Sequence, residues 1–292
     1  MRPRPFTYFA PKSVREATGL LQRYRGHAKI LAGGCSLIPT MKLRLVSPEY
    51  LVDINRIGHL SYIKTHGRTV RIGALTHYCD LETSTVIQKL CPVIAEGARQ
   101  IADAQVRNRG TIGGNIVHAD PANDLPPLVL ASDAEFILQG GQKRRIVKAD
   151  DFYLGVFQTA AKPTEILTEV KIPGQPPWGG FAYLKLERKA GDFAVASAAV
   201  VLTLDSQGNF SRVRIALGAV ASTAIRVPKA EKLLVGRRPD DDLLKEAAGL
   251  AEEASDPAAD LRGSREYKQD MVNVITTRAL KIAVGRAARA HE

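Results

Sequence analysis

The sequence predicts an α+β protein built from three consecutive segments. A helix signal followed by short apolar runs occupies residues 1–57, and two hairpin signals flank a helical stretch between residues 58 and 177. In residues 178–292, strand-like runs come first and helical runs follow, so strands and helices are separated rather than alternating. A length of 292 residues suits two or three packed domains, and 45% apolar residues suffice for their cores.

A helix over residues 13–24 is predicted for the first segment. Ser13 and Glu16 form an S-x-x-E capping box, and the apolar residues after them share one helical face that ends before Gly26. Residues 29–32 and 50–54 are short apolar runs, which predict two buried strands.

The second segment contains hairpin, helix and linker signals. Its apolar runs predict five strands, four of them in two hairpins: residues 60–63, 69–72, 134–139, 145–148 and 165–172. Residues 76–102 follow a helical pattern that Pro92 interrupts. Residues 173–180 are rich in proline and glycine, so we expect a domain boundary there.

The last segment begins with three apolar runs that predict an antiparallel meander: residues 181–186, 196–204 and 213–220. After Pro228 the apolar spacing becomes helical, with one face in residues 243–254 and another in residues 267–275. We therefore expect a small helical bundle at the C-terminal end.

Charge and composition exclude several classes of protein. The 41 Lys and Arg residues exceed the 30 Asp and Glu residues, but they are spread out without interleaved aromatic residues, which favours a solvated surface over a nucleic-acid site. The three cysteines, Cys35, Cys79 and Cys91, include no C-x-x-C pair, and the six histidines have no ligand spacing, so we expect no bound metal. No apolar run is long enough to span a bilayer and the N-terminus lacks an apolar leader, which predicts a cytoplasmic protein.

Two short motifs contain paired glycines beside a small polar residue, AGGCSL at 32–37 and TIGGN at 111–115. Consecutive backbone N–H groups at such turns can bind a phosphate, because glycine allows close approach of the main chain. Two such turns suit a diphosphate, although either pair alone is more often only a tight turn. Neither is a G-x-G-x-x-G or Walker motif, so a Rossmann fold or P-loop ATPase is not predicted.

Longer runs around these motifs resemble the FAD-binding medium subunits of molybdenum hydroxylases. The runs are AGGCSLIPTMKLR at 32–44, RNRGTIGGN at 107–115, ADPANDLP at 119–126, KLERKAGDFAVASAAV at 185–200 and SREYKQDMVNVITTRAL at 264–280. The likeness extends along the whole chain and is stronger to aerobic carbon monoxide dehydrogenase than to xanthine dehydrogenase. It implies a two-lobed, PCMH-type FAD-binding domain, with lobes at 1–57 and 58–177, and a C-terminal domain at 178–292.

The resemblance also implies the residues that contact FAD. Both glycine turns would hold the pyrophosphate through backbone N–H groups and side-chain donors, while Asp124 would contact the nucleotide and Lys185 would lie near the flavin. Ile101 would line the cleft, Leu167 would form an apolar wall, and Phe193 would cover one flavin face. The full implied set is Ala32, Gly33, Gly34, Cys35, Ser36, Leu37, Ile101, Thr111, Ile112, Gly113, Gly114, Asn115, Asp124, Leu167, Lys185 and Phe193. No catalytic side chain and no metal ligand is implied.

Two positions depart from the family pattern. Phe193 stands where carbon monoxide dehydrogenase subunits usually carry a tyrosine, so a ring can still stack but its hydroxyl is missing. Cys35 stands where glutamine or histidine is common, which removes a side-chain hydrogen bond but not the backbone site. Covalent flavin attachment through Cys35 is conceivable, yet the family binds FAD without a covalent bond, so we expect a non-covalent cofactor.

The implied function is electron transfer through FAD inside a larger oxidoreductase. A large subunit with molybdopterin would oxidise the substrate, a small subunit with two [2Fe-2S] clusters would relay single electrons, and this chain would pass them through FAD to an external acceptor. The implied assembly is a dimer of heterotrimers, and the net charge of +11 would help docking to acidic partner surfaces. The acceptor stays open between a quinone, NAD and oxygen, and the substrate between carbon monoxide, a purine, an aldehyde and an N-heteroaromatic ring.

Two other functions are compatible with the same residues. One is a flavin-free phosphate-binding or assembly subunit that has kept the fold, which absence of flavin absorption would identify. The other is a stand-alone flavin reductase of the same superfamily, resembling the cell-wall sugar-nucleotide reductase. That enzyme would need acid–base residues and would act without partner chains.

Overall fold

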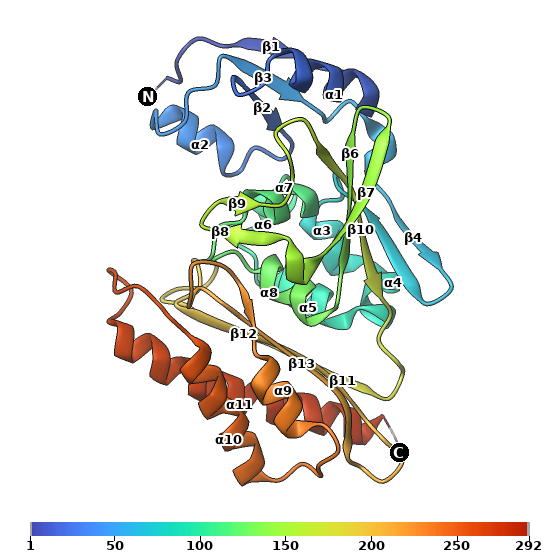
Figure 1. Cartoon of the computed structure of the whole chain (residues 1–292), viewed down its shortest axis with the longest axis vertical. Helices are drawn as coiled ribbons and strands as arrows, with labels where there is room; N and C mark the ends of the chain where they lie inside the picture. Colours follow the sequence, from blue (N-terminus) through green and yellow to red (C-terminus); the bar gives the residue numbers. More distant parts are fainter. Residues whose placement is uncertain (1, 291–292) are drawn as a thin grey trace.

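Three successive layers of sheet and helix run from the N-terminal to the C-terminal end of the molecule (Figure 1). The computed structural model describes residues 2–290. Among these residues, no helix combines the length and the apolar composition needed to cross a membrane.

The first layer is a three-stranded parallel sheet in the order β1–β3–β2, with strands β1 (Thr7–Phe9), β2 (Ala28–Leu31) and β3 (Tyr50–Asp53). The predicted helix is confirmed as α1 (Val14–Arg23), where the Ser13 hydroxyl accepts a hydrogen bond from the Glu16 N–H at 3.1 Å. Both predicted strands are present, but β2 is only half-buried because it is an edge strand. The short helix α2 (Leu37–Lys42) follows the first glycine turn and was not predicted.

The second layer is a five-stranded antiparallel sheet in the order β4–β5–β10–β6–β7. Its strands are β4 (Ile63–His66), β5 (Thr69–Gly73), β6 (Glu135–Gly140), β7 (Lys143–Lys148) and β10 (Ile166–Pro173). Both predicted hairpins are confirmed, although the first begins later than expected because Gly58–Leu60 forms a 3-10 turn. A second 3-10 turn (Ala149–Asp151) and the short pair β8 (Tyr153–Gly155) and β9 (Gln158–Thr159) were not predicted.

The second layer also contains six short helices, of which α4 and α7 contact the five-stranded sheet directly: α3 (Tyr78–Thr83), α4 (Thr85–Leu90), α5 (Pro92–Arg99), α6 (Ala104–Arg107), α7 (Ile112–His118) and α8 (Leu125–Ala131). The helical pattern over residues 76–102 therefore corresponds to three helices. Pro92 occupies the first position of α5, where the missing N–H group breaks no intrahelical bond.

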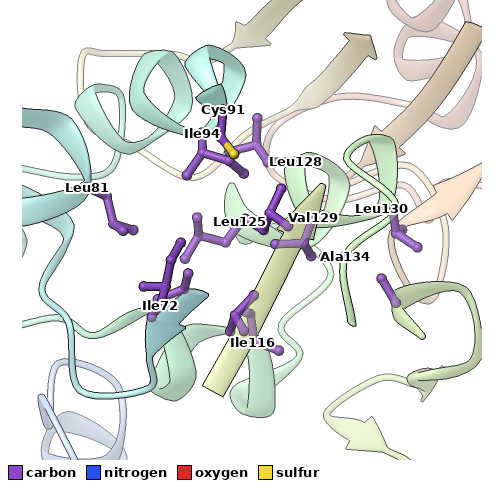
Figure 2. Close-up of a cluster of buried hydrophobic side chains, with 14 of the residues drawn as sticks. Ile72, Leu81, Cys91, Ile94, Ile116, Leu125, Leu128, Val129, Leu130 and Ala134 are labelled. Atoms are coloured by element: carbon purple, nitrogen blue, oxygen red, sulfur yellow. The ribbon is translucent and has the colours of Figure 1, made fainter. Parts of the chain in front are cut away.

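The side chains of these elements form the main hydrophobic core (Figure 2). Ile72 from β5, Ile94 from α5, Ile116 from α7 and Leu128 from α8 are all fully buried there. The core continues into the next layer, because Val201 of the C-terminal sheet belongs to the same cluster. The layers are thus joined by apolar packing as well as by the chain.

The third layer is an antiparallel sheet in sequence order, with strands β11 (Gly179–Leu186), β12 (Ala196–Leu204), β13 (Phe210–Gly218) and β14 (Ile225–Arg226). This confirms the predicted meander. Every residue of β12 is buried, because α5 and α8 lie toward one face of the sheet and C-terminal helices cover the other (Figure 1). The C-terminal helices are α9 (Pro228–Leu234), α10 (Asp241–Ala254) and α11 (Arg265–Arg289).

The predicted C-terminal helices are confirmed, and they pack on one another and on the sheet. The apolar face predicted for residues 267–275 is wrong in part, since Tyr267 is exposed while Ala279 and Ala283, further along α11, are fully buried. The small side chains are required by close packing: a Cβ atom on Gly180 of β11 would lie only 1.8 Å from the Ala283 carbonyl oxygen. Close packing against the sheet, and not the position of the large apolar residues, determines which face of α11 is buried.

Residues 173–180 are held firmly in spite of their linker composition. The Gln175 N–H donates to the Leu90 carbonyl oxygen at 2.7 Å, and Gln175 Nε2 donates to the Gly180 carbonyl oxygen at 2.8 Å. The Arg68 guanidinium donates to the Gln175 carbonyl oxygen. The connection between β10 and β11 is therefore short and fixed.

An ionic cluster also joins the second and third layers. Asp133, between α8 and β6, accepts hydrogen bonds from Arg212, from Arg214 Nε at 2.9 Å and from Arg226 Nη1 at 3.2 Å. Burial tends to raise the pKa of Asp133, but the hydrogen bonds from Arg212 and Arg214 prevail and hold it below its usual value. Ionised Asp133 consequently stabilises the layer boundary.

Replacing Asp133 with asparagine should lower the free energy of unfolding at pH 7 by about 2 kcal/mol, because three guanidinium groups lose a shared carboxylate. The pKa of Asp133 is lower in the folded protein than in the unfolded chain, so this stabilisation is complete above the unfolded pKa and is lost as pH falls through the folded pKa. Urea titrations at one pH above the unfolded pKa of Asp133 and one pH below its folded pKa measure this loss of stabilisation. Asp150→Asn removes an exposed partner of Arg226 and should cost less than about 0.5 kcal/mol; equal losses for both variants would contradict the assignment.

Candidate functional site

The two glycine motifs lie side by side in the folded chain. A Cβ atom on Gly33 would approach the Arg109 carbonyl oxygen to 2.3 Å and Gly110 Cα to 2.9 Å. A Cβ atom on Gly114 would lie 3.7 Å from the Ala32 Cβ. The backbone of the first motif therefore contacts the two residues that immediately precede the second motif, at a distance that only glycine at position 33 allows.

The first motif presents a row of available backbone donors. It connects β2 to α2 and turns at Gly34, whose φ of +80° is in the left-handed region. Within residues 2–290, the N–H groups of Gly33, Gly34, Cys35, Ser36 and Leu37 donate no hydrogen bond. Consecutive N–H groups without acceptors form a site for an anion such as a phosphate.

The second motif differs from the expectation because it begins a helix. Thr111 caps α7, and its hydroxyl and carbonyl oxygens accept hydrogen bonds from Gly114 and Asn115. The N–H groups of Ile112 and Gly113 donate to carbonyl oxygens of residues 76 and 74. All four N–H groups of residues 112–115 are thus bonded within the chain, and the role of residues 111–115 in binding FAD stays a prediction.

Asn115 is the group that the second motif offers to a ligand. Asn115 Nδ2 donates to the Tyr78 hydroxyl at 3.1 Å, and burial raises the pKa of Tyr78, so that this hydroxyl stays protonated. Asn115 Oδ1 is buried and has no hydrogen-bond donor among the described residues. A buried amide oxygen without a donor costs about 1–3 kcal/mol, so it fits a site that a ligand donor completes.

Ile101 lies in a turn that contacts the C-terminal domain. Arg107 Nη1 donates to the carbonyl oxygens of Ile101 at 3.1 Å and Ala102 at 3.2 Å, and Ala102 has a φ of +44°. Gly191, in the loop between β11 and β12, packs on this turn, since its Cβ would lie 2.8 Å from the Ala102 carbonyl oxygen. The contact of Arg107 with this turn was not predicted, because one arginine among many has no distinguishing pattern in the sequence.

Lys185 and Asp124 form a buried pair across the boundary between the second and third layers. The Lys185 ammonium lies 3.2 Å from Asp124 Oδ1, 3.2 Å from Glu187 Oε2 and 3.2 Å from the Gln100 carbonyl oxygen. The ammonium donates hydrogen bonds to the Gln100 carbonyl oxygen and, at 3.3 Å, to Asp124 Oδ2. Burial raises the pKa of Asp124, whereas Lys185 and a hydrogen bond from Tyr183 oppose that rise.

The remaining two predicted residues differ in accessibility. Leu167, on β10, is buried in the main core, so the structure does not bring its side chain to an open surface. Phe193 is 46% exposed in the loop between β11 and β12, and the Arg262 guanidinium lies 5.9 Å from the centre of its ring. Arg262 was also missed, because it is distant in sequence.

A cavity of about 390 Å³ opens beside the Phe193 loop. It lies between the second layer and the loops of the C-terminal domain, and its lining includes Asp120, Ala122, Val156, Ala194, Ser222 and Arg262. Because Arg262 contacts both the cavity and the Phe193 ring, the exposed aromatic face and the cavity belong to one region.

Comparison with known proteins identifies the family. Residues 4–175 match the FAD binding domain in molybdopterin dehydrogenase. The chain belongs to this family. Residues 181–283 of this FAD-binding subunit match the CO dehydrogenase flavoprotein C-terminal domain. The predicted α+β fold class and the prediction of an FAD-binding oxidoreductase subunit are confirmed.

Similar proteins cover the chain almost completely. The carbon monoxide dehydrogenase medium chain of Hydrogenophaga pseudoflava is 46% identical over 99% of this chain and 100% of its own length. The glyceraldehyde dehydrogenase medium chain of Sulfolobus acidocaldarius is 39% identical over 96% of this chain and 99% of its own. A solved structure of the Hydrogenophaga pseudoflava carbon monoxide dehydrogenase superposes with a TM-score of 0.96 at 48% identity, covering 98% of this chain and 99% of that chain.

Gly33→Ala should push the first glycine motif away from the residues that precede the second, because the added Cβ would collide with the Arg109 carbonyl oxygen. We expect a loss of about 2 kcal/mol in the free energy of unfolding and at least about tenfold weaker FAD binding. Chemical denaturation and flavin fluorescence titration measure the two effects.

Gly19→Ala is the matched control, since an added Cβ in α1 meets no atom within 4 Å. This exposed helical position should gain up to about 1 kcal/mol and leave FAD binding unchanged. Normal FAD affinity in Gly33→Ala would show that the contact of Gly33 with Arg109 and Gly110 does not shape the site.

Proposed function

We propose that this chain binds FAD non-covalently beside its two glycine motifs and passes electrons from the [2Fe-2S] clusters of a partner subunit to an external acceptor. The supporting observation is that the unbonded N–H groups of residues 33–37 and the unpaired Asn115 Oδ1 belong to neighbouring segments, because Gly33 contacts residues 109 and 110 just before the second motif. When bound, FAD supplies one- and two-electron chemistry that the side chains lack.

The proposed roles follow from what each residue presents. The N–H groups of residues 33–37 bind the diphosphate, and Asn115 accepts a ligand hydrogen bond through Oδ1. Asp124 contacts the nucleotide and Lys185 lies near the flavin, and their ion pair forms the polar end of the site. Phe193 covers an exposed flavin face, and the neighbouring cavity admits the acceptor.

The proposed division of the chain into residues 1–57, 58–177 and 178–292 is supported by the three sheets. Each sheet draws all its strands from one of these segments. The FAD-binding residues then come from all three segments, so the cofactor would bridge them.

Non-covalent binding is supported by the state of Cys35. Burial raises the pKa of the Cys35 thiol and Arg109 only partly opposes this rise, so the thiolate is disfavoured. The thiolate is the nucleophilic form that a covalent linkage to flavin would need. Cys35 therefore acts in this proposal only through its backbone N–H.

The proposed partners are a large molybdopterin subunit and a small [2Fe-2S] subunit, assembled as a dimer of heterotrimers in the cytoplasm. Support comes from relatives whose names describe them as medium chains. Their names specify carbon monoxide and glyceraldehyde dehydrogenases, so similar chains serve different substrates. The substrate is accordingly assigned to the large subunit.

Titration of the flavin-free protein with FAD tests the central proposal. We expect saturable quenching of flavin fluorescence and, after acid precipitation, release of all flavin into the supernatant. Absence of binding would favour the flavin-free phosphate-binding alternative. Flavin retained in the precipitate would contradict non-covalent binding.

Phe193→Ala in the assembled enzyme should lower kcat/KM for the acceptor about tenfold while changing the FAD dissociation constant less than about twofold, because the ring covers one face only. Acceptor-dependent steady-state kinetics and flavin content measure the two effects. Trp178→Ala is a matched control, because Trp178 is similarly exposed at 48% but lies in the β10–β11 connection. Unaltered acceptor kinetics in Phe193→Ala would count against this role.

A further inference from the structure

Tyr183 brings a buried hydroxyl group from the C-terminal domain into the second layer. The side chain is 1% exposed, and its hydroxyl donates to Asp124 Oδ1 at 2.7 Å. The Tyr183 N–H donates to Glu96 Oε1 at 2.8 Å, and its carbonyl oxygen accepts from Gln100 Nε2 at 3.4 Å. The residue is thus held by α5 at its backbone and by the start of α8 at its hydroxyl.

The strand geometry of β11 explains why Tyr183 and Lys185 act on the same carboxylate. Side chains two residues apart in a strand point to the same face, and both contact Asp124. Asp124 stands at the N-terminal end of α8, but its carboxylate makes no helix-capping bond. The carboxylate instead accepts hydrogen bonds from the two β11 side chains, Tyr183 and Lys185.

The cluster around Lys185 contains two carboxylates, Asp124 and Glu187, and one ammonium. The Lys185 ammonium donates hydrogen bonds to the Gln100 carbonyl oxygen at 3.2 Å and to Asp124 Oδ2 at 3.3 Å, whereas the Tyr183 hydroxyl donates to the other carboxylate oxygen, Asp124 Oδ1. Glu187 Oε2 is buried and has no hydrogen bond in the part of the chain described. The two oxygens of Asp124 thus have different donors, and the Tyr183 hydroxyl supplies the hydrogen bond to Oδ1.

We propose that Tyr183 is a positioning residue of the cofactor site, whose hydroxyl fixes the Asp124 carboxylate beside Lys185 across the layer boundary. This inference rests on the proposed function, because it assigns Asp124 to the side of the site that meets FAD. Tyr183 itself is buried in the main core and acts through Asp124.

Removal of the Tyr183 hydroxyl should change how Asp124 titrates. The charged and titratable groups that face Asp124 are Tyr183, Lys185 and Glu187 from β11 and its end, and Tyr78 from α3. Burial raises the pKa of Asp124, and the hydrogen bond from Tyr183 is one of the contacts that lower it. Without that donor the pKa rises further, so Asp124 becomes protonated at a higher pH.

The test is a titration of flavin-free Tyr183→Phe with FAD across the range from about pH 5 to pH 8. We expect FAD binding about tenfold weaker at pH 7, the order of one hydrogen bond to a charged group. The decline in affinity toward acid pH should also begin at a higher pH than in the wild type. A merely structural role would not move this pH dependence.

Tyr153→Phe is the matched control. The Tyr153 hydroxyl is buried and has no hydrogen-bond partner within residues 2–290, so its removal should leave both the affinity and its pH dependence unchanged. Asp124→Asn is the second variant: it should bind FAD weakly without the acid decline, and adding Tyr183→Phe to it should have little further effect.

The outcomes separate this inference from the proposed function. A wild-type protein that binds FAD, together with a Tyr183→Phe variant that follows the wild-type pH curve, would overturn the inference alone. Additive losses in the Asp124→Asn, Tyr183→Phe double variant would also overturn it. A wild-type protein that binds no FAD would remove the proposed function and this inference with it.

Discussion

The direct contact of Gly33 with the backbone of Arg109 and Gly110 determines the geometry of the site. It brings the unbonded N–H groups after β2 next to the start of α7, although these segments belong to different layers. A side chain at position 33 would push the two apart. The glycines therefore serve different purposes: Gly33 permits the contact, and Gly34 permits the turn through its φ of +80°.

The second constraint is that the C-terminal sheet is covered on both faces. Its side toward α5 and α8 includes the apolar residues Ala199, Val201 and Ala216, but Tyr183 and Lys185 carry polar groups into the same boundary. Burying these groups is tolerable because Asp124 provides acceptors for both. The apolar packing and the polar pair thus fix the C-terminal domain relative to the FAD-binding domain, and with it the loop that carries Phe193.

Short-range signals account for the elements that sequence analysis predicted well. The Ser13 N-cap starts α1 and Pro92 starts α5, because both act on groups within one helical turn. The sequence predicts a second backbone site at the TIGGN motif. The hydrogen bonds that its N–H groups make to residues 74 and 76 cannot be read from the motif, because they depend on how a distant segment folds against it. Tyr183 lies two residues before Lys185 in a predicted strand, so the two side chains share a face, but their common partner Asp124 is distant in sequence.

The sequence by itself determined the α+β class, the meander, the hairpins and, through motif resemblance, the family. These features depend on local periodicity and on motifs that are contiguous along the chain. Tertiary structure decided which glycine motif keeps unbonded N–H groups, which face of α11 is buried, and which partners surround Lys185. The physical reason is that hydrogen-bond satisfaction and burial depend on which distant segments fold against each group.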